Sequence, residues 1–138
     1  MDAIQTSLAG ITSFALYFSV SLVLLLAFKF VYALVTPHDE WKLVKEQQNV
    51  AAATGLMGAA IGFSLALASA ASNSVSLIDF ALWGLVALVA QTIAFAIVRF
   101  VFMPKIVQRI EQNEISAGIV LGGVSIAVGI LNAACMTY

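Results

Sequence analysis

The sequence predicts an all-α membrane protein in which four transmembrane helices form two parallel two-helix repeats. Of its 138 residues, 62% are hydrophobic and 9% are charged, whereas a soluble domain is about half apolar and a quarter charged. Four apolar stretches each supply the roughly 20 residues that a helix needs to cross a bilayer. They lie at about 11–35, 51–72, 79–102 and 115–136, so we expect residues 1–138 to form one integral membrane domain. These runs are too long for barrel strands, which leaves helices.

The positions of the basic residues predict how the helices are oriented. All of them lie in or beside the connections 36–49 and 103–114, at Lys29, Lys42, Lys45, Arg99, Lys105 and Arg109. Because basic connections stay in the cytoplasm, both termini are expected on the periplasmic side. Residues 1–10 lack a basic region, and the apolar stretch after them is too long for a signal peptide, so we expect no cleaved signal.

The first stretch is bulky and aromatic, which suits a helix that faces lipid, and residues 1–10 are expected to form a short polar lead before it. Lys29 lies inside this stretch, and an intramembrane charge is by default a functional-site hypothesis. We favour the alternative that its aliphatic stem carries the ammonium to the cytoplasmic interface, because Pro37 is only about 12 Å further along the helix. Arg99 lies in the same way shortly before Pro104.

The first basic connection carries a helix-start signal, with Thr36 as a hydroxyl cap, Pro37 at the first helical position and Asp39 near the positive helix end. Trp41 is expected to anchor this short helix at the headgroup level, with the lysines facing anionic lipid. His38 is the single histidine. Since a metal site needs several ligands, we favour an exposed loop histidine over a metal ligand and expect no cofactor.

The stretches 51–72 and 115–136 are rich in Gly, Ala and Ser, and small side chains let helix backbones approach closely in lipid. We therefore expect these two helices to pack together at the centre through their glycines, which are Gly55, Gly58, Gly62, Gly118, Gly122 and Gly129. Ser64 and Ser69 can each bond the carbonyl four residues back, so they need not mark a pore.

The third stretch begins with Ser76 and Asp79, a spacing typical of a capping box, so Asp79 is expected to be structural rather than a proton carrier. Trp83 follows at interface depth. Gln91 is the deepest strongly polar side chain, and Asn132 lies near the outer end of the last helix. Such amides either line a path or hydrogen-bond between helices, and we favour the second role, which is the commoner for a neutral amide in lipid.

The two halves of the chain resemble each other, which predicts repeats at about 11–72 and 79–136. Each half has a bulky helix, a basic connection and a small-residue helix. Two spans per half give both halves the same orientation, so an axis along the membrane normal relates them. Three short matches support this: Ala15-Leu16-Tyr17 with Ala81-Leu82-Trp83, Glu46-Gln47 with Glu111-Gln112, and Ser69-Ala70-Ala71 with Ala133-Ala134-Cys135.

Several short strings carry a family resemblance: Thr36 through Trp41, Asn73 through Phe80, Trp83-Gly84 with Gln91, and Asn132 through Thr137. With these strings the chain resembles, over nearly its whole length, the YjfL-type family of bacterial inner-membrane proteins. That family is built from a duplicated two-helix domain of unknown function. The resemblance implies a location in a bacterial inner membrane and brings no activity, cofactor or catalytic residue with it.

Two function classes remain open, and an enzyme is disfavoured because no paired acids, histidine cluster or Ser/Lys-type site lies at membrane depth. Cys135 is the single cysteine, which excludes an intrachain disulfide and a multi-cysteine metal site. We favour a homo-oligomeric structural protein in the lipid bilayer, or one that anchors a cytoplasmic membrane-surface protein. The alternative is a small oligomeric channel or transporter for ions or small solutes. No nucleic-acid partner is expected.

Overall fold

The computed structural model describes residues 2–37 and 40–136, and over these ranges the chain is helical with short connections. Four of these helices are long and apolar enough to cross a membrane, which confirms the predicted fold class. The elements are α1 (Ala3–Val35), α2 (Glu40–Gln47), α3 (Val50–Asn73), α4 (Leu77–Ile97), a π-helical turn (Val98–Phe102) that extends α4, α5 (Ile106–Glu111) and α6 (Ile115–Ala134).

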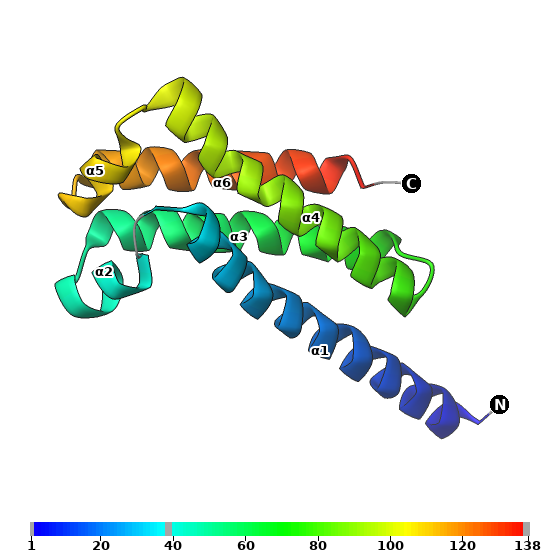
Figure 1. Ribbon diagram of the computed structural model, residues 1–138. Coiled ribbons are helices and arrows are strands. Elements are labelled where there is room, and N and C mark those ends of the chain that lie inside the picture. The colour runs from blue at the N-terminus through cyan, green and yellow to red at the C-terminus, as the bar shows by residue number, and fades with distance from the viewer. Residues whose placement is uncertain (1, 38–39, 137–138) are drawn as a thin grey trace.

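The helices form a bundle with α3 and α6 at its centre (Figure 1). These two helices run side by side in the same direction, and α4 crosses both of them in the opposite direction. α1 packs on α3 and α4 with its C-terminal half and diverges from the bundle toward its N-terminus. The short helices α2 and α5 lie at one end of the bundle, and the N-terminus of α1 and the C-terminus of α6 lie at the other.

α1 is longer than the sequence predicted, because it begins at Ala3 and not near residue 11. The expected polar lead over residues 1–10 is therefore wrong. Asp2 makes the early start possible, since its carboxylate accepts a hydrogen bond from the backbone N–H of Ile4 at 3.1 Å and caps the first turn. The 33 residues of α1 span about 50 Å at 1.5 Å per residue. This length exceeds the roughly 30 Å of a bilayer's hydrocarbon core.

Thr36 ends α1, and its predicted role as the cap of the next helix involves residues 38–39 and lies outside the described residues. Its hydroxyl and its backbone N–H both donate to the carbonyl of Tyr32, each at 2.9 Å. Proline disfavours helical backbone at the residue before it, and Thr36 before Pro37 is extended, with φ −86° and ψ 129°. α2 is described from Glu40 onward, and the predicted roles of His38 and Asp39 lie outside the described residues.

Both ends of α4 follow from local sequence. Ser76 starts the helix as predicted, because its hydroxyl accepts from the backbone N–H of Asp79 at 3.1 Å. The carboxylate of Asp79 accepts from the N–H of Val75 at 2.9 Å, which confirms its structural role in a capping box. At the other end the π-helical turn closes with the N–H of Met103 donating to the carbonyl of Val98 at 2.7 Å, just before Pro104 ends the helix.

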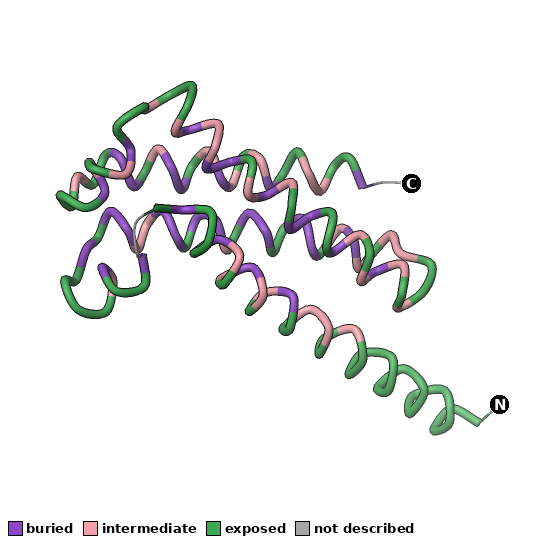
Figure 2. The backbone as a smooth tube through the Cα atoms, in the orientation of Figure 1, coloured by how far each residue is buried: buried purple, intermediate pink, exposed green. Residues whose placement is uncertain are grey.

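Burial separates the central helices from α1 (Figure 2). α3 is buried along its whole length, mostly through alanines and glycines. α1 buries only Leu24, Phe28 and Tyr32, and every residue from Ala3 to Leu16 is exposed. The N-terminal half of α1 therefore takes no part in the core of the described chain.

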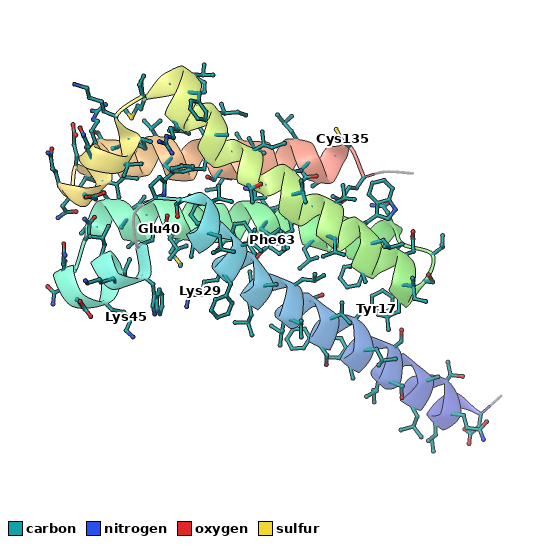
Figure 3. All side chains as sticks on the ribbon, in the orientation of Figure 1. Tyr17, Lys29, Glu40, Lys45, Phe63 and Cys135 are labelled. Atoms are coloured by element: carbon teal, nitrogen blue, oxygen red, sulfur yellow. The ribbon has the colours of Figure 1, made fainter. Side chains whose placement is uncertain are left out.

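Two aromatic stacks attach the other half of α1 to the bundle (Figure 3). The ring of Phe28 stacks on Phe63 of α3 with 4.8 Å between centroids. The ring of Tyr17 stacks on Phe80 of α4 with 5.3 Å between centroids. Such pairs add to the stabilisation from buried area, and Tyr17 marks the point beyond which α1 leaves the bundle.

Candidate functional site

The glycine-rich faces of α3 and α6 meet along one contact, here called the seam. Its glycines are Gly58 and Gly62 of α3 and Gly118, Gly122 and Gly129 of α6. A Cβ atom added at any of them would overlap backbone atoms of the facing helix. Gly55 differs, because its added Cβ would meet only the end of the Leu121 side chain, which can move. The seam is thus a backbone-to-backbone contact inside one protomer, the approach that small residues permit in lipid.

Gln91 of α4 reaches the seam from the side. It is fully buried, and its Nε2 donates to the carbonyl of Ser125 at 2.7 Å. The hydroxyl of Ser125 donates to the carbonyl of Leu121 at 2.7 Å. An added Cβ on Gly62 would meet the Gln91 amide, so α3, α4 and α6 converge here. Gln91 Oε1 has no hydrogen-bond partner among the described residues.

Two further polar contacts tie together the half of the bundle that holds the C-terminal end of α6. Asn132 of α6 donates through Nδ2 to the carbonyl of Ala87 in α4 at 3.3 Å. The hydroxyl of Ser69 in α3 donates to the carbonyl of Ala133 at 2.7 Å. The prediction that Ser69 bonds within its own helix is therefore wrong, because the close approach of α3 and α6 brings a carbonyl of the neighbouring helix within reach. Ser64 does bond the carbonyl of Ala60, at 2.8 Å, as predicted.

Two asparagines join the basic connections, and the sequence analysis missed both. Asn49 caps α3 by accepting from the N–H of Ala52 at 2.8 Å, and its Nδ2 donates to the carbonyl of Ile110 at 2.7 Å. Asn113 accepts from the N–H of Ala51 at 3.1 Å and has a positive φ of 58°. Asparagine just before an apolar run is a helix-start signal, and that signal would have identified Asn49.

The basic side chains inside or beside the spans lie against aromatic rings. Lys29 Nζ lies 4.7 Å from the ring centroid of Trp41, and Lys45 Nζ lies 5.9 Å from the same ring. The guanidinium carbon of Arg99 lies 5.6 Å from the ring centroid of Phe100. Lys29 and Lys45 lie on the same side of the bundle, next to α2 (Figure 3). The geometry thus gathers two ammonium groups around Trp41, whereas Trp83, the other predicted anchor, is half-buried against the core.

Arg109 and Glu114 form a two-pronged ion pair in the second basic connection. Arg109 donates through Nε and Nη2 to the Glu114 carboxylate at 2.8 and 2.7 Å. These hydrogen bonds lower the pKa of the Glu114 carboxyl and raise the pKa of the Arg109 guanidinium. Because the pKa of Glu114 falls on folding, its contribution to stability is present above its ordinary pKa and is lost as pH falls through the lowered value. The pair holds the turn between α5 and α6.

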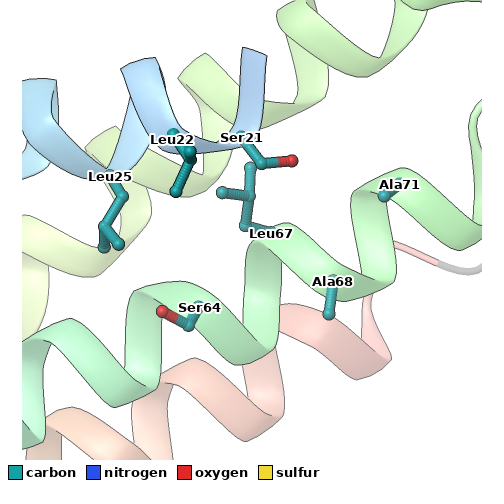
Figure 4. Close-up of a pocket in the computed structure, with 7 residues that line it drawn as sticks. All are labelled: Ser21, Leu22, Leu25, Ser64, Leu67, Ala68 and Ala71. Atoms are coloured by element: carbon teal, nitrogen blue, oxygen red, sulfur yellow. The ribbon is translucent and has the colours of Figure 1, made fainter. Parts of the chain in front are cut away.

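Two apolar cavities lie between α1 and α3. One has a volume of about 210 Å³ and lies beside Ser21, Ser64 and Leu67 (Figure 4). The other, about 290 Å³, lies nearer the basic end beside Lys29, Trp41 and Met57, and both cavities are lined by Leu25. The hydroxyls of Ser21 and Ser64 donate to carbonyls of their own helices, at 2.7 and 2.8 Å, so the cavity walls are apolar.

The described residues contain no group of three or more His, Cys, Asp or Glu that could hold a metal ion. Cys135 is an exposed free cysteine near the C-terminal end of α6 (Figure 3). The structure brings together two polar groups of side chains. Gln91 forms a hydrogen bond with Ser125, and the ammonium groups of Lys29 and Lys45 form cation–π contacts with Trp41.

Comparison with known proteins identifies the relatives of this chain. A family model described as Domain of Unknown Function (DUF350) matches residues 6–136. The UPF0719 inner membrane protein YjfL of Escherichia coli K12, and that of strain O157:H7, are each 40% identical over 131 residues. Those residues are 95% of this chain and 98% of each relative. No solved structure matches. The names of the relatives state an inner-membrane location and no activity.

Proposed function

The chain belongs to the DUF350 family of YjfL-like inner membrane proteins, and from that premise we propose that it is a non-enzymatic structural protein that self-associates in the membrane. The four apolar helices give it contact with the lipid bilayer as a multi-pass protein. The observation that supports self-association is the exposed N-terminal half of α1.

The buried face of α1 continues into this exposed half as a line of small residues. The packed part of the face comprises Tyr17, Leu24, Phe28 and Tyr32. From Tyr17 toward the N-terminus, at spacings of three or four residues, follow Ser13, Gly10, Thr6 and Ala3, all exposed. A Cβ added at Gly10 would meet nothing within 4 Å. Small residues on one helix face are typical of contacts between helices in lipid.

A second copy of the chain can pack against this face. Copies in one membrane share an orientation, so two α1 helices would run parallel. Parallel helices with small residues on the facing sides can form a two-fold symmetric contact, in which the same patch meets itself. In this arrangement the seam holds each protomer together and the Gly10 face of α1 joins two protomers.

Cysteine cross-linking in native membranes tests this arrangement. In a Cys135→Ser background, Gly10→Cys should give a disulfide-linked dimer under mild oxidation, because disulfides need Cα atoms within about 7 Å. Ala15→Cys, on the opposite face of α1, should remain monomeric. Equal cross-linking at both positions, or none at position 10, would contradict self-association through this face.

We also propose that the two halves are parallel repeats. In the alignment that matches Ser69 with Ala133, Gly58 is matched with Gly122. Both pairs are in contact across the seam, since the Ser69 hydroxyl bonds the Ala133 carbonyl and Gly58 faces Gly122. An axis along the membrane normal between α3 and α6 would bring such matched positions together. α1 and α4 depart from this symmetry, because α4 crosses both central helices and α1 packs on α3 and α4.

The orientation we propose places both termini in the periplasm and α2 and α5 in the cytoplasm, supported by the charge bias of the connections. The exposed amphipathic helices α2 and α5 would then be available to a cytoplasmic membrane-surface partner. Single cysteines at Gln47 and Ser74, in the Cys135→Ser background, should differ toward an impermeant thiol reagent on intact cells, with only position 74 labelled. Labelling at position 47 alone would reverse the orientation.

A conduit for ions or small solutes is the second candidate, and one observation favours it. Gln91 Oε1 has no hydrogen-bond partner among the described residues, so it is free to accept from a water or a polar solute. We rank this function second because the amide nitrogen of Gln91 already bonds Ser125. The two cavities between α1 and α3 also have apolar walls and are not lined by Gln91.

A further inference from the structure

The two cavities between α1 and α3, here together called the cleft, share Leu25, and the one nearer the basic end lies beside α2, which packs on α3. Its inner walls are apolar, with Leu25 and Phe28 of α1 opposite Leu56 and Ala60 of α3. Lys29 and Trp41 line the same cavity. The cleft therefore combines an apolar interior with a cation and an indole ring.

Two ammonium groups share that indole. Lys29 Nζ lies 4.7 Å and Lys45 Nζ 5.9 Å from the ring centroid of Trp41. The structure gives neither lysine a carboxylate partner among residues 2–37 and 40–136. Tryptophan settles at the headgroup level of a bilayer, so the two charges lie at the depth of lipid phosphates. Two like charges at that depth favour an anion between them.

The interior of the cleft is suited to an acyl chain. From Met57, in the cavity beside Trp41, to Ala71, in the cavity shown in Figure 4, α3 rises by about 21 Å. That exceeds the roughly 15 Å of hydrocarbon that one leaflet provides. Leu25 belongs to both cavities, and the serine hydroxyls nearby are bonded within their own helices. Apart from Lys29 and Trp41 at the basic end, the described side chains that line the two cavities place no free donor against an apolar chain.

We propose that this cleft binds one anionic phospholipid of the leaflet next to α2. Its phosphate diester lies between Lys29 and Lys45 at Trp41, and one acyl chain runs along Leu25 between α1 and α3. The site is formed within a single protomer, so it does not depend on self-association, and its test is separate from that of the proposed function.

Lipid titration of the purified protein tests the site. Protein in neutral phosphatidylcholine nanodiscs is titrated with phosphatidylglycerol, and bound lipid and melting temperature are measured. The parent should retain about one phosphatidylglycerol per chain and melt at a higher temperature. Lys29→Gln and Lys45→Gln should each weaken binding about fivefold, as expected for one lysine near an anionic lipid. Lys105→Gln, in the other basic connection, is the matched control and should bind as the parent does.

Two further measurements distinguish binding of the whole lipid from binding of its headgroup alone. Inorganic phosphate and soluble glycerophosphoglycerol should give less than a tenth of the melting shift, because neither fills the cleft. Ala60→Leu, which narrows the cleft, should lower phosphatidylglycerol retention while the protein keeps its melting temperature in neutral lipid. An equal shift with soluble phosphate would overturn the proposal. So would equal binding by Lys29→Gln, Lys45→Gln and the Lys105→Gln control, or retention unchanged in a folded Ala60→Leu variant.

Discussion

Glycine is used in two ways in this protein, and the contrast between the seam and the N-terminal half of α1 shows both. In the seam, a Cβ on Gly58 would overlap Gly122, so the space that glycine leaves is filled by another helix of the same chain. On α1, a Cβ on Gly10 would meet nothing. Glycine weakens a helix relative to alanine, so a gain from close helix contact offsets that cost in the seam. At Gly10 the described residues supply no such contact.

The comparison explains why small-residue content alone does not identify an oligomer interface. The two G-x-x-x-G pairs, Gly58 with Gly62 and Gly118 with Gly122, lie in contacts within the chain. The face of Gly10 has no such motif and yet lies in line with the buried face of α1. We infer that the glycine-rich helices stabilise the protomer and that α1 carries the contact between protomers.

The largest effect is expected for Gly58→Leu. A leucine side chain there would collide with the backbone of α6, and overpacking against backbone costs on the order of 3 kcal/mol or more. Gly123→Leu is the matched control, because a Cβ at Gly123 meets nothing within 4 Å. Thermal unfolding in detergent should show a much lower melting temperature for the first variant and little change for the second. Equal tolerance of both would place the seam elsewhere.

A smaller effect is expected for Gln91→Leu, which removes the bond to the Ser125 carbonyl. Hydrogen bonds between membrane helices contribute about 0.6 kcal/mol on average and up to about 1.7, so the melting temperature should fall modestly. Thr92→Val is the control, since the Thr92 hydroxyl bonds within its own helix, to the Val89 carbonyl. Proton and potassium leak in liposomes should be the same for Gln91→Leu and the parent. A specific leak in the parent that is absent from a normally folded Gln91→Leu variant would favour the conduit.

The four transmembrane helices could be predicted from the sequence, because a long apolar run in lipid satisfies its backbone hydrogen bonds by forming a helix. The capping box at Ser76 and Asp79 was also predictable, since every atom in it lies within five residues. The end of α1 was predictable from local sequence as well, because Pro37 disfavours helical backbone at Thr36 and the Thr36 hydroxyl bonds the Tyr32 carbonyl.

Contacts between segments that are far apart in the chain could not be predicted from the sequence. Ser69 bonds Ala133, and Asn49 bonds Ile110, only because the seam brings those backbones together. The grouping of Lys29 and Lys45 at Trp41 likewise depends on how α2 folds back beside α1. Glycine spacing indicated which helix faces are small but not which helix each face meets.

Gly10→Leu tests the central contrast most directly, with the assembly state and the melting temperature measured on the same sample. Because a Cβ at Gly10 meets no described residue within 4 Å, the variant should keep the melting temperature of the parent while its dimer in native nanodiscs dissociates to monomer. Ala15→Leu, which adds the same side chain on the opposite face, should leave both unchanged. A Gly10→Leu protein that remains dimeric, or a parent that is monomeric throughout, would contradict the assignment of the seam to the protomer and of α1 to the contact between protomers.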